Sequence, residues 1–162
     1  MRLIVTKMPS LKGVRNIARF NEALEAVLPV TGLDPSTAGE IQIVFVTVPR
    51  MTALNALHLH HSGPTDVITY DLRQQNDAFA MPAEFGDPTL AEIYVCPEVA
   101  RTQAPQFNET PSRELFRYAA HGLLHLAGED DLTSEALASM RKAEQRVLEA
   151  AEKSGFDLQN FL

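Results

Sequence analysis

The sequence predicts a single domain that combines helices and strands, and three observations lead to this prediction. The chain has 162 residues, a length that one hydrophobic core can serve. Four short segments are rich in β-branched and aromatic residues and are bounded by turn formers, as strands are. Apolar residues at helical spacing lie between the early strands and through the C-terminal part. We therefore expect residues 1–162 to form one domain in which helices first alternate with strands.

The first half of the chain contains both kinds of element. The four predicted strands are RLIVTK near the N-terminus, EIQIVFVT (Glu40–Thr47), DVITYDL (Asp66–Leu72) and AEIYVCP (Ala91–Pro97). A helix is expected between the first two strands, where apolar residues recur at helical spacing from Ile17 to Leu28. The segment MTALNALHLHH (Met51–His61) permits a second helix, which Gly63 and Pro64 would end.

The segments around the fourth strand are less regular. Residues Arg73 to Thr89 show no sustained period and are expected to form a long loop. After the strand, a helix is expected to begin at Glu98 and to be interrupted near Pro105.

Two longer helices are expected at the C-terminal end. Thr110 and Pro111 have the pattern of an N-cap followed by proline at the first helical position, and this helix should run to Ala127. Gly128 is placed to end it, because the residue just past a helix often takes the left-handed conformation. The last helix should run from Thr133 to Lys153.

Charge and composition argue against several classes of protein. The formal net charge is −7, which argues against the basic surface of proteins that bind nucleic acid without sequence preference, so any such contact must be local. The apolar runs fall far below the roughly 18 residues of a membrane span, and the N-terminus lacks a secretory signal. We therefore expect a soluble cytoplasmic protein with no membrane partner. The single cysteine, Cys96, lies in an apolar run and is expected to be a core residue.

The strongest functional signal is the segment HGLLHLAGEDD, residues 121–131. Residues four apart on a helix lie on one face with Cβ atoms roughly 6 Å apart, so His121 and His125 can place two imidazole nitrogens on one ion. Gly128 permits the chain to turn back, and Asp131 can then supply a carboxylate. The pattern H-x3-H-x2-G-x2-D leaves a position for water, as catalytic zinc sites do. We predict a metal centre formed by these two histidines and Asp131.

Two other interpretations of the motif exist. A pair of histidines at this spacing also occurs on helices that bind no metal, where the rings are packed or solvated. A zinc peptidase of the HExxH type would place a glutamate directly after the first histidine, where it activates water. Gly122 stands at that position and has no side chain, so peptidase chemistry by that route is not expected.

Three segments resemble one known family. HGLLHLAGEDD resembles the H-G-x-L-H-L-x-G-Y-D-H signature of the YbeY endoribonucleases, metal-dependent enzymes of bacterial ribosomal RNA maturation. LNALHLHHSGPTDVITY (Leu54–Tyr70) is similar to the family's L-N-x-x-Y-R-x-x-x-x-P-T-D-V-L-S-F segment. AEIYVCPEVARTQA (Ala91–Ala104) is similar to its G-D-I-x-I-C-x-E-x-A-x-x-Q-A segment.

The resemblance implies both a fold and a function. The implied fold is α+β, with a small mixed four-stranded sheet packed by about five helices and the metal helix lining a cleft. The implied cofactor is one zinc ion or another divalent metal. The implied activity is hydrolysis of phosphodiester bonds in single-stranded RNA, in rRNA maturation and ribosome quality control. The implied partners are rRNA and the small ribosomal subunit or its assembly factors.

The third metal ligand departs from the family pattern. The family has a histidine where this chain has Asp131, and Asp130 is the fallback ligand if the turn differs by one residue. Aspartate is a competent zinc ligand, but an anion in place of a neutral imidazole lowers the net charge of the site from about +2 to about +1. Such a site acidifies water less and can favour a harder metal.

A second departure concerns the cation expected to assist catalysis. The family's arginine in Y-R corresponds to Leu59, which cannot stabilise charge developing on a phosphate. His58, His60 and His61 surround this position. His58 can supply a cation or a general acid, or these histidines can be solvated residues at a helix end.

Three further positions carry alternatives. Arg117, one helical turn before the first histidine, can reach a phosphate bound at the metal, or it can pair with Glu114 or Glu109. Thr65 and Asp66 match the family's P-T-D, where they either line the cleft or hold the turn by hydrogen bonds to backbone.

Two functions of different classes follow. The first is a metal-dependent endoribonuclease in which Arg117 or His58 steadies charge; no general base is apparent. The second is a binding protein that keeps the fold and docks on the small ribosomal subunit or an assembly factor, with weakened or lost catalysis. Leu59 and Asp131 favour the second function.

Overall fold

A computed structural model describes residues 1–58, 63–73 and 87–162. In these residues, four strands form one sheet in the order β1-β2-β4-β3. The strands are β1 (Arg2–Lys7), β2 (Glu40–Phe45), β3 (Val67–Asp71) and β4 (Thr89–Val95). Strands β1, β2 and β4 are parallel, and β3 runs antiparallel to β4. The sheet is therefore small and mixed, as the family resemblance implied.

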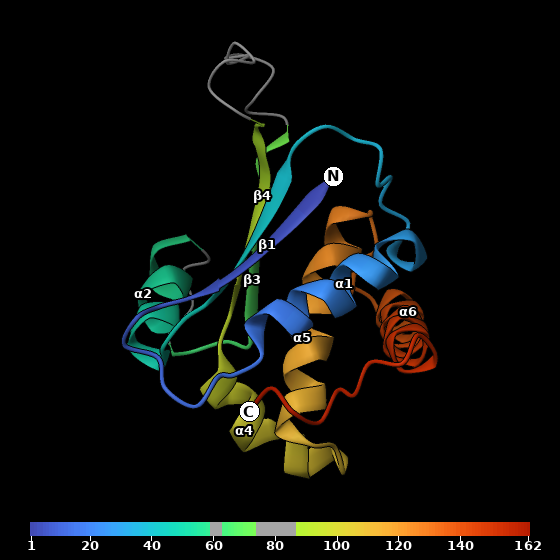
Figure 1. Ribbon diagram of the computed structural model, residues 1–162. Coiled ribbons are helices and arrows are strands. Elements are labelled where there is room, and N and C mark those ends of the chain that lie inside the picture. The colour runs from blue at the N-terminus through green and yellow to red at the C-terminus, as the bar shows by residue number, and fades with distance from the viewer. Residues whose placement is uncertain (59–62, 74–86) are drawn as a thin grey trace.

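Helices cover both faces of this sheet. The α-helices of the described residues are α1 (Ile17–Thr31), α2 (Val48–His58), α4 (Pro97–Gln103), α5 (Pro111–Leu126) and α6 (Ser134–Lys153), and a 3-10 helix, η2 (Ala104–Phe107), follows α4. Helices α1, α5 and α6 lie on one side of the sheet and α2 on the other (Figure 1). The predicted α+β fold with about five helices is confirmed. No helix in the described part of the chain is long and apolar enough to cross a membrane.

Several element boundaries differ from those expected. Pro97, expected in the fourth strand, is the first residue of α4, where its fixed φ fits and its missing N–H costs no hydrogen bond. Pro105 does not end the helical path, because η2 continues it to Phe107. Most of the predicted loop Arg73–Thr89 falls on residues 74–86, which lie outside the described part.

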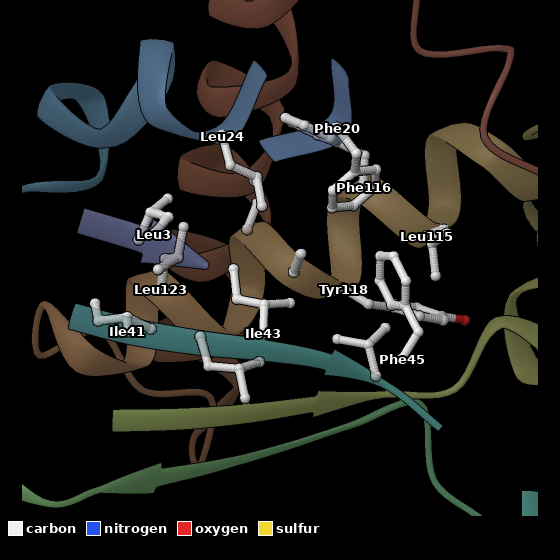
Figure 2. Packing of buried hydrophobic residues seen from close by; sticks show 14 of the residues in the cluster. Leu3, Phe20, Leu24, Ile41, Ile43, Phe45, Leu115, Phe116, Tyr118 and Leu123 are labelled. Atoms are coloured by element: carbon white, nitrogen blue, oxygen red, sulfur yellow. The ribbon is translucent and has the colours of Figure 1, made fainter. Parts of the chain in front are cut away.

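The core lies between the sheet and helices α1 and α5. Along β2, Ile41, Ile43 and Phe45 are buried in alternation and point into this layer (Figure 2). Phe20 of α1 is central, since its ring lies 5.1 Å from that of Phe45, with two further rings of the core nearby. Cys96 is fully buried, and burial raises the pKa of its thiol, so its predicted role as a core residue is confirmed.

Helix α5 lies unusually close to the sheet at Gly122. A Cβ atom at this position would lie 2.7 Å from Ile93 Cγ2 and 2.9 Å from Thr69 Oγ1. Only glycine therefore allows the helix to pack against β3 and β4 at this distance. Gly122 thus fixes the position of α5 against β3 one residue after His121.

The other end of α5 has the predicted N-cap. The Thr110 side chain accepts a hydrogen bond from the Arg113 N–H.

Candidate metal centre

The two histidines of α5 meet at their outer nitrogens. Nε2 of His121 lies 2.8 Å from Nε2 of His125, and each Nδ1 has its own partner. Nδ1 of His125 lies 2.9 Å from the backbone oxygen of Glu129, which can only accept, so this Nδ1 carries a proton. Nδ1 of His121 lies 2.8 Å from Oε1 of Glu144. With both inner nitrogens donating, both Nε2 atoms face one point, where either a proton shared between them or a metal ion can join the two rings.

This arrangement fits a cation. Two lone pairs that face each other repel, and a positive ion bound by both removes the repulsion. Carboxylate and backbone oxygens that orient histidine ligands through the inner nitrogen are the usual surroundings of protein metal sites. The orientation of His121 and His125 therefore allows both Nε2 atoms to bind one metal ion.

Asp131 completes the group. Its Oδ2 lies 3.8 Å from Nε2 of His121, and its Oδ1 lies 4.0 Å from Nε2 of His125. Ligand atoms around a tetrahedral zinc ion stand roughly 3.3 Å apart, given bonds of about 2.0 Å. The three residues offer ligand atoms within 4.8 Å of one another. The Asp131 side chain is 36% exposed, so the group is open to solvent on the side of this residue. Asp130, the fallback ligand, instead accepts the Leu132 N–H at 3.1 Å.

The turn that delivers this carboxylate is built by Gly128. Its φ is +100°, in the left-handed region predicted for it. The Glu129 N–H bonds to the oxygen of Leu124 at 3.1 Å, and the Gly128 N–H bonds to the oxygen of His125 at 3.0 Å. This pair of bonds ends a helix while reversing the chain. The same turn supplies the backbone oxygen that holds His125.

Sequence reasoning missed Glu144. This residue of α6 is 2% exposed, and its carboxylate contacts the first histidine from across the helix pair. Burial acts to raise the pKa of Glu144, but the hydrogen bond and charge of His121, with Arg141 and Arg117, hold that pKa below its ordinary value. The missed signal was a carboxylate on the buried face of α6, three residues before Val147.

The structure places Arg117 among carboxylates. Its guanidinium lies 2.7 Å from Glu109, 3.0 Å from Glu114 and 3.7 Å from Glu144, and its side chain is 12% exposed. Of the two alternatives for this residue, pairing is the one that the contacts display. Its role towards a phosphate remains a prediction.

The remaining predicted residues have different outcomes. Thr65 and Asp66 both line the cavity at the metal group. Asp66 also holds the turn, because its Oδ1 accepts the Val67 N–H at 2.9 Å. The Thr65 hydroxyl donates to this carboxylate rather than to a backbone group. His58 is the last residue of α2, and its side chain lies outside the described part. Leu59, His60 and His61 lie outside the described residues altogether.

A cavity of about 320 Å³ opens at the metal group. Its charged lining has four carboxylates and two guanidinium groups, namely Asp66, Glu114, Asp131, Glu144, Arg117 and Arg141. The excess of two negative charges is the formal charge that one divalent cation cancels. Burial and the charge of Glu114 raise the pKa of Tyr118, so this residue lines the cavity as a neutral hydroxyl. The cavity therefore favours a cation over a free anion.

Comparison with known proteins assigns the family. A family model described as endoribonuclease YbeY matches residues 7–152, which is most of the chain. The chain belongs to the YbeY family of endoribonucleases. The expected family membership is thus confirmed.

Individual YbeY relatives agree along most of their length. An endoribonuclease YbeY of Elusimicrobium minutum (strain Pei191) is 33% identical over 143 residues, which are 88% of this chain and 92% of the relative. One of Parafrankia sp. (strain EAN1pec) is 34% identical over 142 residues, 82% of this chain and 86% of the relative. Among solved structures, the chain is similar to a Thermotoga maritima protein whose solution structure is known, with 25% sequence identity and a TM-score of 0.59. This match covers 93% of this chain and 91% of the Thermotoga maritima chain. Nuclease chemistry is therefore the activity for which relatives of this chain are named.

Proposed function

We propose that the chain, as one domain of residues 1–162, is a metal-dependent endoribonuclease that hydrolyses single-stranded RNA. Its cellular role is rRNA maturation and ribosome quality control in the cytoplasm, with the small ribosomal subunit or assembly factors as partners. The observation that carries the proposal is the pair of Nε2 atoms 2.8 Å apart, next to the carboxylate of Asp131. The YbeY relatives support RNA as the substrate.

The residues of the site have distinct tasks in this proposal. His121, His125 and Asp131 would hold one zinc ion or another divalent metal. Such an ion supplies Lewis-acid chemistry, which polarises a phosphoryl oxygen and makes water a better nucleophile. Glu144 orients the first histidine, and the adjacent cavity accepts the scissile segment. His58 and Arg117 remain the proposed sources of positive charge, and Arg117 must share its charge with three carboxylates.

A binding protein with weakened catalysis is the alternative. Leu59 in place of the family's arginine favours it, because no guanidinium stands at that position to stabilise charge on a phosphate. Asp131 favours it as well, since an anionic third ligand makes the site less positive. The two proposals differ in whether RNA is cut once it is bound.

A metallopeptidase is disfavoured by packing. The position of the peptidase glutamate is Gly122, and a side chain there would meet Ile93 at 2.7 Å. A glutamate that acts as a general base therefore cannot stand at this position.

The proposal predicts zinc-dependent cleavage of single-stranded RNA. Zinc-loaded wild type is expected to cut a labelled single-stranded RNA into discrete fragments, and a matched duplex is expected to stay intact. His121→Ala removes a nitrogen ligand and is expected to lower the rate at least 100-fold, since the chemistry depends on the ion. EDTA should abolish cleavage, and added zinc should restore it. The measurement is gel analysis of timed reactions.

The control for contamination is the variant itself. If His121→Ala, purified in the same way, cuts RNA as fast as wild type, the activity belongs to a contaminating protein. If wild type binds zinc and small ribosomal subunits but cuts no RNA, the alternative replaces the proposal.

A further inference from the structure

We propose that Phe107 and Arg141 form a nucleotide-binding subsite beside the metal centre. In this subsite a base of the RNA strand stacks on the ring of Phe107, and a phosphate of the same strand pairs with the guanidinium of Arg141. The inference deepens the proposed function and rests on it, because it takes single-stranded RNA as the substrate.

The hollows around the metal group share lining residues. A hollow of about 370 Å³ along β3 shares Val67 and both histidines with the metal cavity. A hollow of about 240 Å³, here called the outer hollow, shares Phe107, Glu114, Arg117 and Arg141 with the metal cavity. The metal cavity thus adjoins both hollows, and in this proposal the RNA strand follows them past β3, the metal group and the outer hollow. This geometry suits an extended strand cut in its interior.

Arg141 is the available guanidinium on this path. Its side chain is 56% exposed, and NH1 makes a hydrogen bond of 3.3 Å to Oε2 of Glu144. Arg117 lines the same hollow but is 12% exposed and surrounded by carboxylates. A guanidinium has five N–H donors in a fork that matches a phosphate, so Arg141 retains donors directed to solvent. Among the guanidinium groups lining the outer hollow, it is the one placed to meet the substrate.

Phe107 is exposed where a base can reach it. The residue is 58% exposed, while Phe20, Phe45 and Phe116 are fully buried. It is the last residue of η2, and the segment is held by Asn108, whose N–H bonds to the oxygens of Ala104 and Pro105. Stacking of a base on an exposed aromatic ring is favourable because it removes the apolar face of the ring from water. Every base has a flat π-face, so stacking does not depend on which base is present. The ring therefore adds affinity without sequence preference.

Leu137 lies beside this pair on the same face of α6 as Arg141. Leu137 is 41% exposed and lines the metal cavity, four residues before Arg141. Phe107 lines the same cavity from η2, so the two residues provide apolar surfaces that a base or sugar can contact. The metal cavity thus combines these apolar surfaces with its charged lining.

Binding of a defined RNA tests the subsite. The probe is a fluorescein-labelled single-stranded 2′-O-methyl phosphorothioate RNA dodecamer, which is cut slowly, titrated with zinc-loaded protein in anisotropy measurements. Phe107→Ala is expected to weaken binding roughly 5-fold to 100-fold, the range for loss of one stacked base. Phe107→Tyr keeps a ring and should bind like wild type, and Phe107→Leu should bind like the alanine variant. Arg141→Ala should lower the slope of log affinity against log salt by about 0.7, the value for one phosphate of a single strand.

Arg146→Ala is the matched control for Arg141. Arg146 is an exposed residue of the same helix and does not line the metal cavity or either adjoining hollow. Its replacement should leave the salt slope unchanged. Zinc content and thermal midpoint are measured for each variant. Both should match wild type in the Phe107 variants, because this residue is 58% exposed. Arg141 also bonds to Glu144, so its variants are compared with wild type at equal zinc content. Should Arg141→Ala lose zinc, Arg141→Lys takes its place, and its affinity for the dodecamer should still fall because the fork is lost.

The outcomes separate this inference from the proposed function. If wild type cuts RNA while affinity and salt slope are unchanged in the Phe107 and Arg141 variants, the subsite is overturned and the nuclease proposal stands. If the variants weaken binding as expected but wild type cuts no RNA, the subsite stands and the nuclease proposal fails.

Discussion

Glu144 controls the orientation of the first histidine of the metal group. It comes from α6, is 2% exposed, and bonds to Nδ1 of His121 at 2.8 Å. A carboxylate in this role fixes which ring nitrogen carries the proton and makes the other a better ligand. Arg117 and Arg141 contact the same carboxylate and hold it in place. We therefore expect Glu144 to act as a positioning residue, through the histidine, on a metal ion bound there.

Glu144→Gln is expected to weaken zinc binding by about 10-fold to 100-fold, because the amide carries no charge and orients the ring less firmly. The measurement is competition with a chromophoric zinc chelator. The matched control is Glu149→Gln, a partly exposed residue of the same helix whose replacement should leave zinc affinity unchanged. Equal zinc affinity in Glu144→Gln and wild type would remove Glu144 from the site.

At the residue scale, the sequence predicted three candidate ligands that the structure brings together, but not the residues that contact them. The spacing of His121 and His125 follows from helix geometry, which is local. Glu144 lies 23 residues from His121 along the chain, and only packing of α5 against α6 brings them together. Arg117 illustrates the same limit, since both of its alternatives were compatible with the sequence and the contacts display pairing with Glu109 and Glu114.

The element that positions the site is helix α5. Three of its features were predicted from sequence: the N-cap at Thr110, proline at the next position, and the left-handed residue Gly128. Each is a local property of the backbone. The close approach at Gly122 was not predicted, because it depends on Ile93 and Thr69 of neighbouring strands.

Gly122→Ala tests this close approach by the sign of its effect. In an open helix, alanine in place of glycine stabilises by about 1 kcal/mol. Here the added methyl meets Ile93 and Thr69, and overpacking of this kind costs about 1–3 kcal/mol. The two effects together are expected to lower the free energy of unfolding by up to about 2 kcal/mol, measured by urea denaturation.

The control for Gly122→Ala is Ala138→Gly at an exposed position of α6, which measures helix propensity alone in the same protein. Its cost should be about 1 kcal/mol. A gain in stability for Gly122→Ala would mean that the helix and sheet are not in close contact at this point.

At the scale of the whole molecule, the metal group joins parts that are distant along the chain. Two candidate ligands come from α5, the third from the turn after it, and the carboxylate that contacts His121 from α6. An ion bound only by the folded chain stabilises it by about 2.7 kcal/mol at a free concentration 100 times its Kd. For a domain of this size, that corresponds to a rise in Tm of roughly 5–11 °C.

Zinc is therefore expected to raise the Tm of wild type by this amount relative to EDTA-treated protein, as measured by circular dichroism. His121→Ala should show little or no rise under the same conditions. A similar rise in both proteins would locate the bound zinc elsewhere on the chain.

The sequence by itself determined the succession of strands and helices along the chain, the pair of histidines on one helical face and the glycine turn after them. It also determined membership of the YbeY family. All of these depend on local backbone preferences or on motifs that can be read along the chain. Only the tertiary structure decided which carboxylate contacts His121, what surrounds Arg117, and that two hollows adjoin the metal cavity. These features depend on how α5, α6 and β3 pack, and a spacing along one segment carries no information about a side chain that another segment supplies.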